Sequence, residues 1–272
     1  AARPAADRDT VWERFDGDDP NRRMELEETP WLRESRGGDT GDLRLLHVLD
    51  PDVAASQRRD ALAKLEKAQT SSGGFPWFPG GPPSPWITLY LVDGFSRALE
   101  FGVEVPKPMV VSAWRYLHRW YLDELVREAM AQDCCWESVS YLGYVLSAYP
   151  DESWTGGVFT ADERRTMLDF SWKHWRQHSP RLKAYLALTL HRAGRQADAR
   201  LVLDSILDSA TTDEDLGTYW AREDKSWLWY RDTVESHAFI LRAVSELDPD
   251  DPRRDGLIQW LFLEKKLGHW KS

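Results

Sequence analysis

Apolar residues recur at spacings of three and four from about Asp50 to the end of the chain, the period of an amphipathic helix. Proline, glycine and aspartate interrupt this pattern at the expected helix ends, and no stretch alternates convincingly as a strand would. We therefore predict an all-α fold. The predicted helices span residues 52–69, 85–101, 107–130, 135–148, 161–178, 180–193, 195–209, 231–246 and 252–266.

The predicted helices are of two kinds. Some carry charge over a broad face and must meet solvent on that side, namely 58–69, 161–178, 195–209 and 252–266. Others are small and apolar around most of their circumference, which is typical of a buried helix, namely 138–149, 181–194 and 233–247. Outer and inner helices that alternate through short links predict an α/α toroid, a ring of helical hairpins. A superhelical solenoid of the same hairpins is the alternative.

The chain is expected to divide into an irregular N-terminal part and a regular helical domain. Residues 1–45 are acidic, rich in glycine and proline and weakly periodic, so we expect an irregular lead-in with short helices there. Residues 46–272 form the predicted helical domain. Within it, Gly102 and Gly194 stand where helix C-termini are expected.

The segment 69–81, QTSSGGFPWFPGG, is predicted to join two helices. A double glycine ends one helix, and Pro76 and Pro79 hold the aromatic residues in a stiff turn before the next helix begins. Six residues of this region recur at a constant offset near the C-terminus. Arg58, Arg59, Asp60, Leu62, Gly73 and Phe75 match Arg253, Arg254, Asp255, Leu257, Gly268 and Trp270. The segment is therefore predicted to be a repeated helix-to-helix junction.

The composition of the chain limits the kinds of partner that it can bind. The 272 residues carry a net charge of −10 with both signs interleaved, which disfavours nucleic acid and anionic membranes as partners. No apolar run is long enough to span a bilayer. The 15 tryptophans could line a carbohydrate or isoprenoid cavity, but packing at helix junctions is the commoner use of such rings. The two cysteines, Cys134 and Cys135, are neighbours and are not expected to form a disulfide.

Candidate catalytic and metal-binding patterns are weak. Asp16 to Asp19 spells DxDD, the acid motif of some isoprenoid cyclases, but no apolar shell surrounds it in sequence. His174 and His178 are four residues apart on one predicted helix, and His118 lies on a different predicted helix. The glutamate that follows the first histidine in zinc proteases is missing, so we expect His174 and His178 to be solvated. Serine-nucleophile elbows and phosphate-binding loops are also missing. We therefore expect no catalytic residue, no metal and no cofactor.

Ordered motifs along the whole chain carry a family resemblance. They are ELEETPWLRES from Glu25, LHVLDPD, SSGGFPWFPGG with ITLYLVDGF, RLKAYLALTLHRAGRQADA from Arg181, DEDLGTYW from Asp213, SWLWYRDTVESHAFILRAV from Ser226 and GLIQWLFLEKKLGHWKS. The chain resembles the thioester-type helical domain of bacterial alpha-2-macroglobulin-like proteins. That resemblance implies an α/α toroid within a larger periplasmic protein, often lipid-anchored, that traps proteases.

One departure limits this implication. The family's thioester needs Cys-x-Glu-Gln, whereas Cys135 is followed by Trp136, Glu137 and Ser138. The resemblance would put the motif upstream of Ala1, and we expect the chain to be a domain fragment truncated at both ends, because it also lacks an initiating methionine.

The leading hypothesis is a noncatalytic domain whose partners are the neighbouring domains of its parent protein and, through the parent, target proteases. A packed rim or partner-facing surface is predicted at Phe75, Trp77, Phe78, Trp227, Trp229 and Tyr230. These rings could instead fill the centre of the toroid. An α/α-toroid enzyme acting on a glycan or an isoprenoid is one alternative, which requires an open central cavity. A helical scaffold that binds peptides is another.

Overall fold

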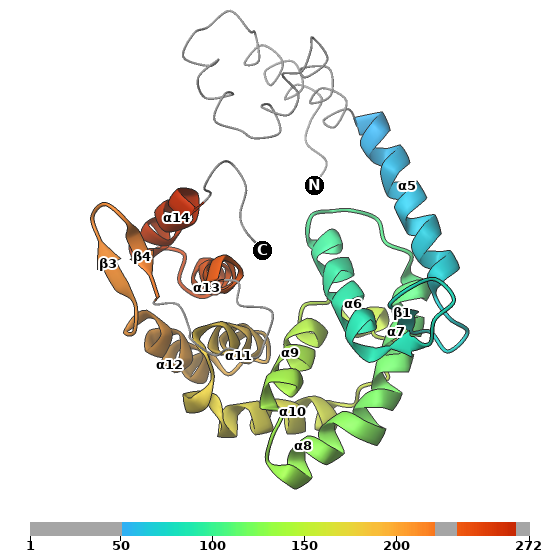
Figure 1. Ribbon diagram of the computed structural model, residues 1–272. Coiled ribbons are helices and arrows are strands. Elements are labelled where there is room, and N and C mark those ends of the chain that lie inside the picture. Colours follow the sequence, from blue (N-terminus) through green and yellow to red (C-terminus); the bar gives the residue numbers. More distant parts are fainter. Residues whose placement is uncertain (1–50, 221–232, 265–272) are drawn as a thin grey trace, which may run out of the picture. The chain divides into compact units, whose positions relative to one another are not determined.

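The computed structural model describes residues 51–220 and 233–264 (Figure 1). They belong to two compact units. The described residues of the first are 51–64 and Glu264, and those of the second are 65–220 and 233–263. Helices account for most of both ranges, so the predicted all-α class is confirmed. The DxDD segment and the whole predicted lead-in, residues 1–45, lie outside the described residues.

The helices follow the predicted order closely. The α-helices are α5 Pro51–Ala68, α6 Pro85–Glu100, α7 Lys107–Trp120, α8 Val126–Gln132, α9 Trp136–Ser147, α10 Ala161–Lys173, α11 Pro180–Arg192, α12 Gln196–Leu207, α13 Thr233–Leu247 and α14 Arg253–Glu264. A π-helical turn, Tyr121–Leu125, connects α7 to α8, and 3₁₀ turns cover Glu152–Trp154 and Trp175–Gln177. The helix predicted over 161–178 therefore ends five residues early, at Lys173.

Two small antiparallel hairpins correct the expectation that the chain has no strands. β1 (Phe75–Pro76) pairs with β2 (Pro83–Ser84), and β3 (Thr211–Asp213) pairs with β4 (Gly217–Tyr219). Strands of two or three residues are too short to show an alternating pattern, and proline within a strand normally argues against one.

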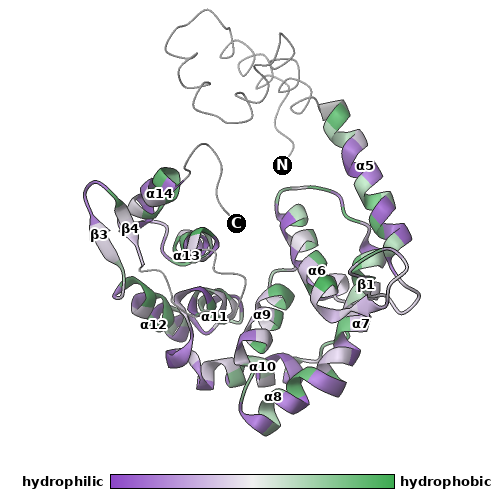
Figure 2. Ribbon diagram, in the orientation of Figure 1, coloured by the Kyte–Doolittle hydropathy of each residue, from purple (hydrophilic) through white to green (hydrophobic). Residues whose placement is uncertain are grey.

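Within the larger unit, the inner helices α6, α9, α11 and α13 are packed in succession, and the outer helices α7, α10 and α12 each pack against an inner helix (Figure 1). Helix α11 touches α9, α10, α12 and α13, and its residues 184–188 and Leu190 are all buried. Helix α12 buries one face only, so hydrophobic and hydrophilic residues alternate along it (Figure 2). The predicted distinction between inner and outer helices is confirmed for α9, α11 and α13 as inner helices and for α10 and α12 as outer ones.

Local signals at the helix ends explain the accuracy of the boundaries. Ser84 and Ser179 each cap a helix that begins with proline, and their side chains accept hydrogen bonds from backbone N–H groups. Gly102 and Gly194 have φ of +71° and +80°, as expected for glycine beyond a helix C-terminus.

The constant-offset match between residues 58–75 and residues 253–270 has no structural counterpart in the described residues. Arg58 lies near the middle of α5, whereas Arg253 is the first residue of α14. Gly268 and Trp270 lie outside the described residues. The repeat therefore remains a prediction from sequence.

Candidate functional site

The segment between α5 and α6 is tightly held. Gln69 Nε2 donates to the carbonyls of Gly73 and Met109 at 2.8 and 2.9 Å, which ties the segment to α7. Gly73 has φ of +93°, and a Cβ on it would lie 2.2 Å from the Ser112 carbonyl oxygen. Only glycine fits this close approach, so the turn is fixed by backbone contacts.

The predicted aromatic residues of this segment separate into two environments. Phe75 is buried, its N–H donates to Thr88 Oγ1 at 2.8 Å, and its ring packs edge-on against Phe95. Trp77 and Phe78, at the tip of the β1–β2 hairpin, remain 65% and 63% exposed. Phe75 is thus a core residue, while Trp77 and Phe78 lie on the surface of the described part of the chain. The other three predicted residues, Trp227, Trp229 and Tyr230, lie outside the described residues.

Helix α6 adds aromatic side chains that the sequence reasoning missed. Trp86 and Tyr90 of α6 and Phe101 at its C-terminal cap are 50%, 69% and 80% exposed. At 3.6 residues per turn they fall within an arc of about 60° on one helix face. Trp86 also packs edge-on against Trp120 at 5.4 Å. We call Trp77, Phe78, Trp86, Tyr90 and Phe101 the exposed aromatic set. The spacing of 86, 90 and 101 would have revealed this face.

The four inner helices meet at a cluster of aromatic rings from α9, α11 and α13 and an arginine from α6. Tyr185 lies 4.7 Å from Tyr144 and 4.6 Å from Phe239, measured between ring centroids, and Tyr141 lies 5.4 Å from Tyr185. Arg97 of α6 lies 4.8 Å from the Phe239 ring. Burial raises the pKa of Tyr141 and of Tyr185 well above that of an ordinary phenol.

Ion pairs link the same helices. Arg181 of α11 pairs with Glu235 of α13 at 2.8 Å, and Arg242 of α13 pairs with Glu100 of α6 at 2.8 Å. The Tyr141 hydroxyl donates to Asp93 at 3.1 Å. The inner helices are therefore joined by both aromatic and charged contacts.

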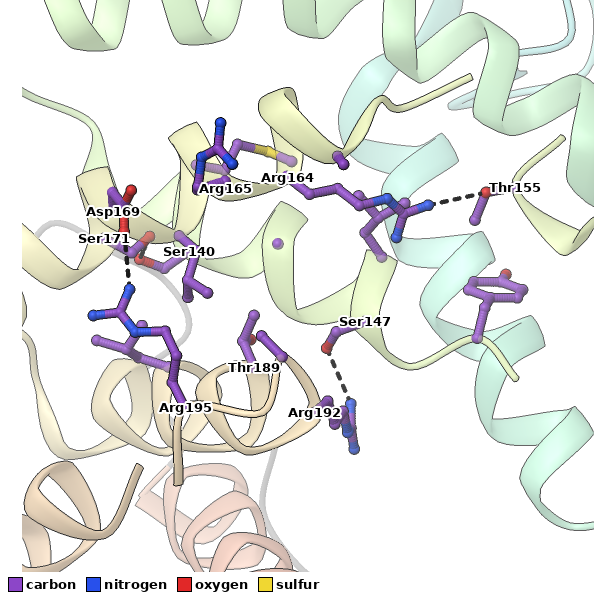
Figure 3. Close-up of a pocket in the computed structure, with 18 of the residues that line it drawn as sticks. Ser140, Ser147, Thr155, Arg164, Arg165, Asp169, Ser171, Thr189, Arg192 and Arg195 are labelled. Carbon is purple, nitrogen blue, oxygen red and sulfur yellow. Dashed lines mark hydrogen bonds and ion pairs between the residues drawn. The ribbon is translucent and has the colours of Figure 1, made fainter. Parts of the chain in front are cut away.

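A cavity of about 680 Å³ lies beside this cluster, between α9, α10 and α11 (Figure 3). Its walls combine apolar residues such as Leu146, Met167 and Leu186 with several arginines and hydroxyl groups. Ser140 and Ser171 are hydrogen-bonded to each other at 2.8 Å on one wall. No sequence motif pointed to this cavity, because its lining is gathered from three helices.

The histidines are buried, not solvated as predicted. His174 stacks on Trp136 and lies 3.0 Å from an Asp133 carboxylate oxygen, while His178 contacts Ser140 Oγ at 3.2 Å. Because α10 ends at Lys173, these histidines do not share a helix face. His118 pairs with Glu163 at 3.0 Å. Across the part of the chain that the structure describes, no three His, Cys, Asp or Glu side chains gather as metal ligands would.

The cysteines are free thiols with Sγ atoms 2.7 Å apart. The hydrogen bond between the two thiols, together with burial, raises the pKa of Cys135 to about 11. At neutral pH this thiol stays protonated and is a weak nucleophile. Among residues 51–220 and 233–264, no helix combines the length and apolar character needed to cross a bilayer.

Together these features define an all-α domain of packed inner and outer helices. Its fold is similar to that of alpha-2-macroglobulin from Escherichia coli. A crystal structure of the native protein from domain MG7 to the C-terminus matches with a TM-score of 0.53 and 19% identity, over 90% of this chain and 37% of that one. A cryo-EM reconstruction of the native conformation matches with a TM-score of 0.53 and 17% identity, over 90% of this chain and 16% of that one. No protein-family profile and no curated protein matches the chain.

The comparison confirms the family resemblance at the level of fold. The chain spans well under half the length of each of these relatives, and at this identity the likeness concerns architecture rather than activity.

Proposed function

We propose that this chain is a noncatalytic α/α-toroid domain of a larger, periplasmic alpha-2-macroglobulin-like protein. It acts through noncovalent contacts with neighbouring domains of its parent during protease capture. The proposal is supported by the fold likeness, which extends over 90% of this chain but only 37% and 16% of the E. coli structures. Such proportions are those of one domain within a multidomain protein.

The observation that carries the proposal is the exposed tip of the β1–β2 hairpin. Trp77 and Phe78 are two-thirds exposed on a turn that hydrogen bonds hold firmly at its base. No Asp, Glu, Lys or Arg occurs from Ala68 to Val92, in a chain that is 29% charged. Rigid aromatic residues in an uncharged surface are characteristic of protein interfaces, because little conformational entropy is lost when a partner covers them.

The contacts are proposed to be noncovalent for a chemical reason. A thioester needs a glutamine side chain to acylate the cysteine. In the family's motif this glutamine comes three residues after the cysteine, and the residue three after Cys135 is Ser138. The raised pKa of the Cys135 thiol also disfavours its reaction. After methylamine treatment of the intact parent protein, peptide mass spectrometry should find no methylamide within residues 1–272. A methylamide on this chain would contradict a noncovalent role.

The domain contact is tested by hydroxyl-radical footprinting of Trp77 and Phe78. Both rings should be oxidised readily in the isolated chain and be protected at least fivefold in the intact parent protein. Leu201 on α12, which is 48% exposed, serves as the reference side chain. Equal oxidation of Trp77 and Phe78 in the two samples would contradict the proposed contact.

A functional variant follows from the same surface. Trp77→Ser with Phe78→Ser should leave the thermal unfolding temperature of the isolated chain unchanged, because neither ring is buried. In the parent protein the pair should reduce retention of a test protease on a gel-filtration column. Leu201→Ser is the matched control and should retain the protease as the unaltered protein does.

A further inference from the structure

The cavity between α9, α10 and α11 has one largely apolar wall. Leu146, Met167, Leu168 and Leu186 contribute to it, and Gly143 is also one of the lining residues. A Cβ on Gly143 would meet nothing within 4 Å, although this glycine sits inside helix α9. At this position α9 therefore presents no side chain to the cavity. The volume of the cavity, about 680 Å³, falls within the usual range for sites that enclose small organic molecules.

Arginines surround this apolar wall, and three of the four are already neutralised. Arg192 holds Glu246 through two hydrogen bonds of 2.9 Å, one from Nε and one from Nη2. Arg195 pairs with Asp169 at 2.9 Å and with Asp198 at 2.7 Å. Arg165 pairs with Asp162 at 2.5 Å, out in solvent. None of these three guanidinium groups needs a further anion.

Arg164 differs from the other three. It is half-buried, its Nη2 donates to Thr155 Oγ1 at 3.2 Å, and its Nε donates to the Phe159 carbonyl at 3.4 Å (Figure 3). No carboxylate of the described residues lies within ion-pair distance of it. Of the five N–H groups of a guanidinium, these bonds use two, which leaves the Nη1–Nη2 edge able to grip a carboxylate.

The electrostatic surroundings of Arg164 agree with this geometry. Burial lowers the pKa of Arg164 below that of an ordinary arginine, and the charge of Glu152 only partly offsets the effect. In contrast, the pKa of Arg181 is raised, because the negative groups around it outweigh its burial. Arg164 is thus a charged group in partly desolvated surroundings that lacks a counter-ion.

The other charges lining the cavity limit the ligand to a single negative charge. Asp151 accepts hydrogen bonds from the N–H and hydroxyl of Ser153, Asp169 is paired with Arg195, and Glu152 lies on the exposed side. These three carboxylates would repel a dianion such as phosphate. One free guanidinium beside an apolar wall suits a monoanion with a hydrocarbon body.

We propose that this cavity binds a small monocarboxylic acid with an apolar body, its carboxylate paired with Arg164 and its hydrocarbon lying along Gly143 and Met167. The site is distinct from the exposed aromatic set and does not depend on the role proposed for the chain in protease capture.

The test is isothermal titration calorimetry of the 272-residue chain at pH 7.5 with octanoate and with 4-phenylbutyrate. At least one acid should bind saturably at one site per chain. 1-Octanol, which has the body without the charge, and sulfate, which has charge without the body, should each bind at least tenfold more weakly. If neither acid binds, or if sulfate or octanol binds as tightly as the acids, the proposal is wrong.

Variants locate the site. Arg164→Gln places an amide N–H where the arginine Nε donates to the Phe159 carbonyl but removes the charge. It should weaken acid binding at least tenfold while octanol binding is unchanged. Gly143→Leu should weaken both acid and octanol binding, because its side chain projects into the cavity. Arg200→Gln and Gly94→Leu are matched controls, since Arg200 does not line the cavity and pairs with Asp204 at 2.8 Å, and a Cβ on Gly94 also meets nothing within 4 Å.

Thermal unfolding establishes that each variant is folded before titration. Should Gly143→Leu unfold, Gly143→Ala takes its place, since alanine is favoured over glycine inside a helix and still narrows the cavity. Binding by Arg164→Gln that equals that of the unaltered chain would overturn the assignment.

Discussion

His178 is a side chain whose protonation the folded chain opposes. It is only 4% exposed, its Nε2 contacts Ser140, and its buried Nδ1 has no hydrogen-bond partner in the described part of the chain. Burial lowers the pKa of His178 to about 4, and the positive charges of Lys183 and His174 act in the same direction. An unfolded histidine titrates near 6.5. The unfolded chain therefore binds this proton at higher pH than the folded one.

The stability of the fold should consequently depend on pH through this residue. The stabilisation from keeping His178 neutral is complete above about pH 6.5 and is lost as the pH falls towards 4. Lowering the pH from 7.5 to 5.0 should therefore reduce the free energy of unfolding by about 2 kcal/mol. Urea denaturation at the two pH values measures this loss. His178→Gln should lower stability at pH 7.5 but flatten the pH dependence, whereas the control His191→Gln should keep the original slope. An unchanged slope in His178→Gln would contradict this explanation.

Helix α10 shows how one local motif fixes an element and also attaches it to a neighbour. The Thr160 hydroxyl accepts from Glu163 N–H at 3.2 Å, and Glu163 accepts from Thr160 N–H at 2.7 Å, which together form a capping box. The second carboxylate oxygen of Glu163 lies 3.0 Å from His118 Nε2 on α7. The N-terminus of α10 is thereby tied to α7.

Removal of this cap should weaken the whole helix. Thr160→Ala leaves the first-turn N–H groups without their acceptor and should cost about 1 kcal/mol of unfolding free energy. Hydrogen exchange should also become faster in the first turn of α10 than at its C-terminus. Thr166→Ala, at an exposed position within the same helix, is the control and should change stability by less than about 0.5 kcal/mol. Equal effects of the two substitutions would show that the cap contributes little.

The helices could be predicted because their signals are local. Proline after Ser84 and Ser179, the acids after Thr160, and glycine at 102 and 194 all act within one turn of the element that they begin or end. The hairpins were missed because their strands are too short to show a pattern. The early end of α10 was missed because apolar residues continue into the 3₁₀ turn at Trp175.

The candidate site was less accessible to sequence reasoning. Phe75, Trp77 and Phe78 lie in one aromatic segment, yet only Phe75 is buried. Its N–H group donates a hydrogen bond to Thr88, thirteen residues later in the sequence. The cavity at Gly143 depends on three helices, and the free charge of Arg164 depends on which acids pair with its neighbouring arginines. Such properties arise from packing between distant residues, which neither spacing nor composition encodes.

At the scale of the larger unit, the inner helices should behave as one cooperative structure. Phe239 of α13 contacts Tyr144 of α9, Tyr185 of α11 and Arg97 of α6, so one ring connects all four inner helices. It is 7% exposed. The helices that meet at this ring lie between residues 85 and 247 of the sequence.

Phe239→Ala tests this cooperativity. Loss of a buried aromatic ring should cost about 3 to 5 kcal/mol of unfolding free energy, because the surrounding rings cannot fully close the cavity left behind. Hydrogen exchange should then accelerate in α6 and α9 as well as in α13. Phe262→Ala removes an equally large ring that is 75% exposed on α14, and it should alter stability by less than about 0.5 kcal/mol. If Phe239→Ala accelerates exchange in α13 while α6 keeps its protection, the helices unfold independently, as the repeats of a solenoid can, and the ring-like arrangement of inner helices loses its support.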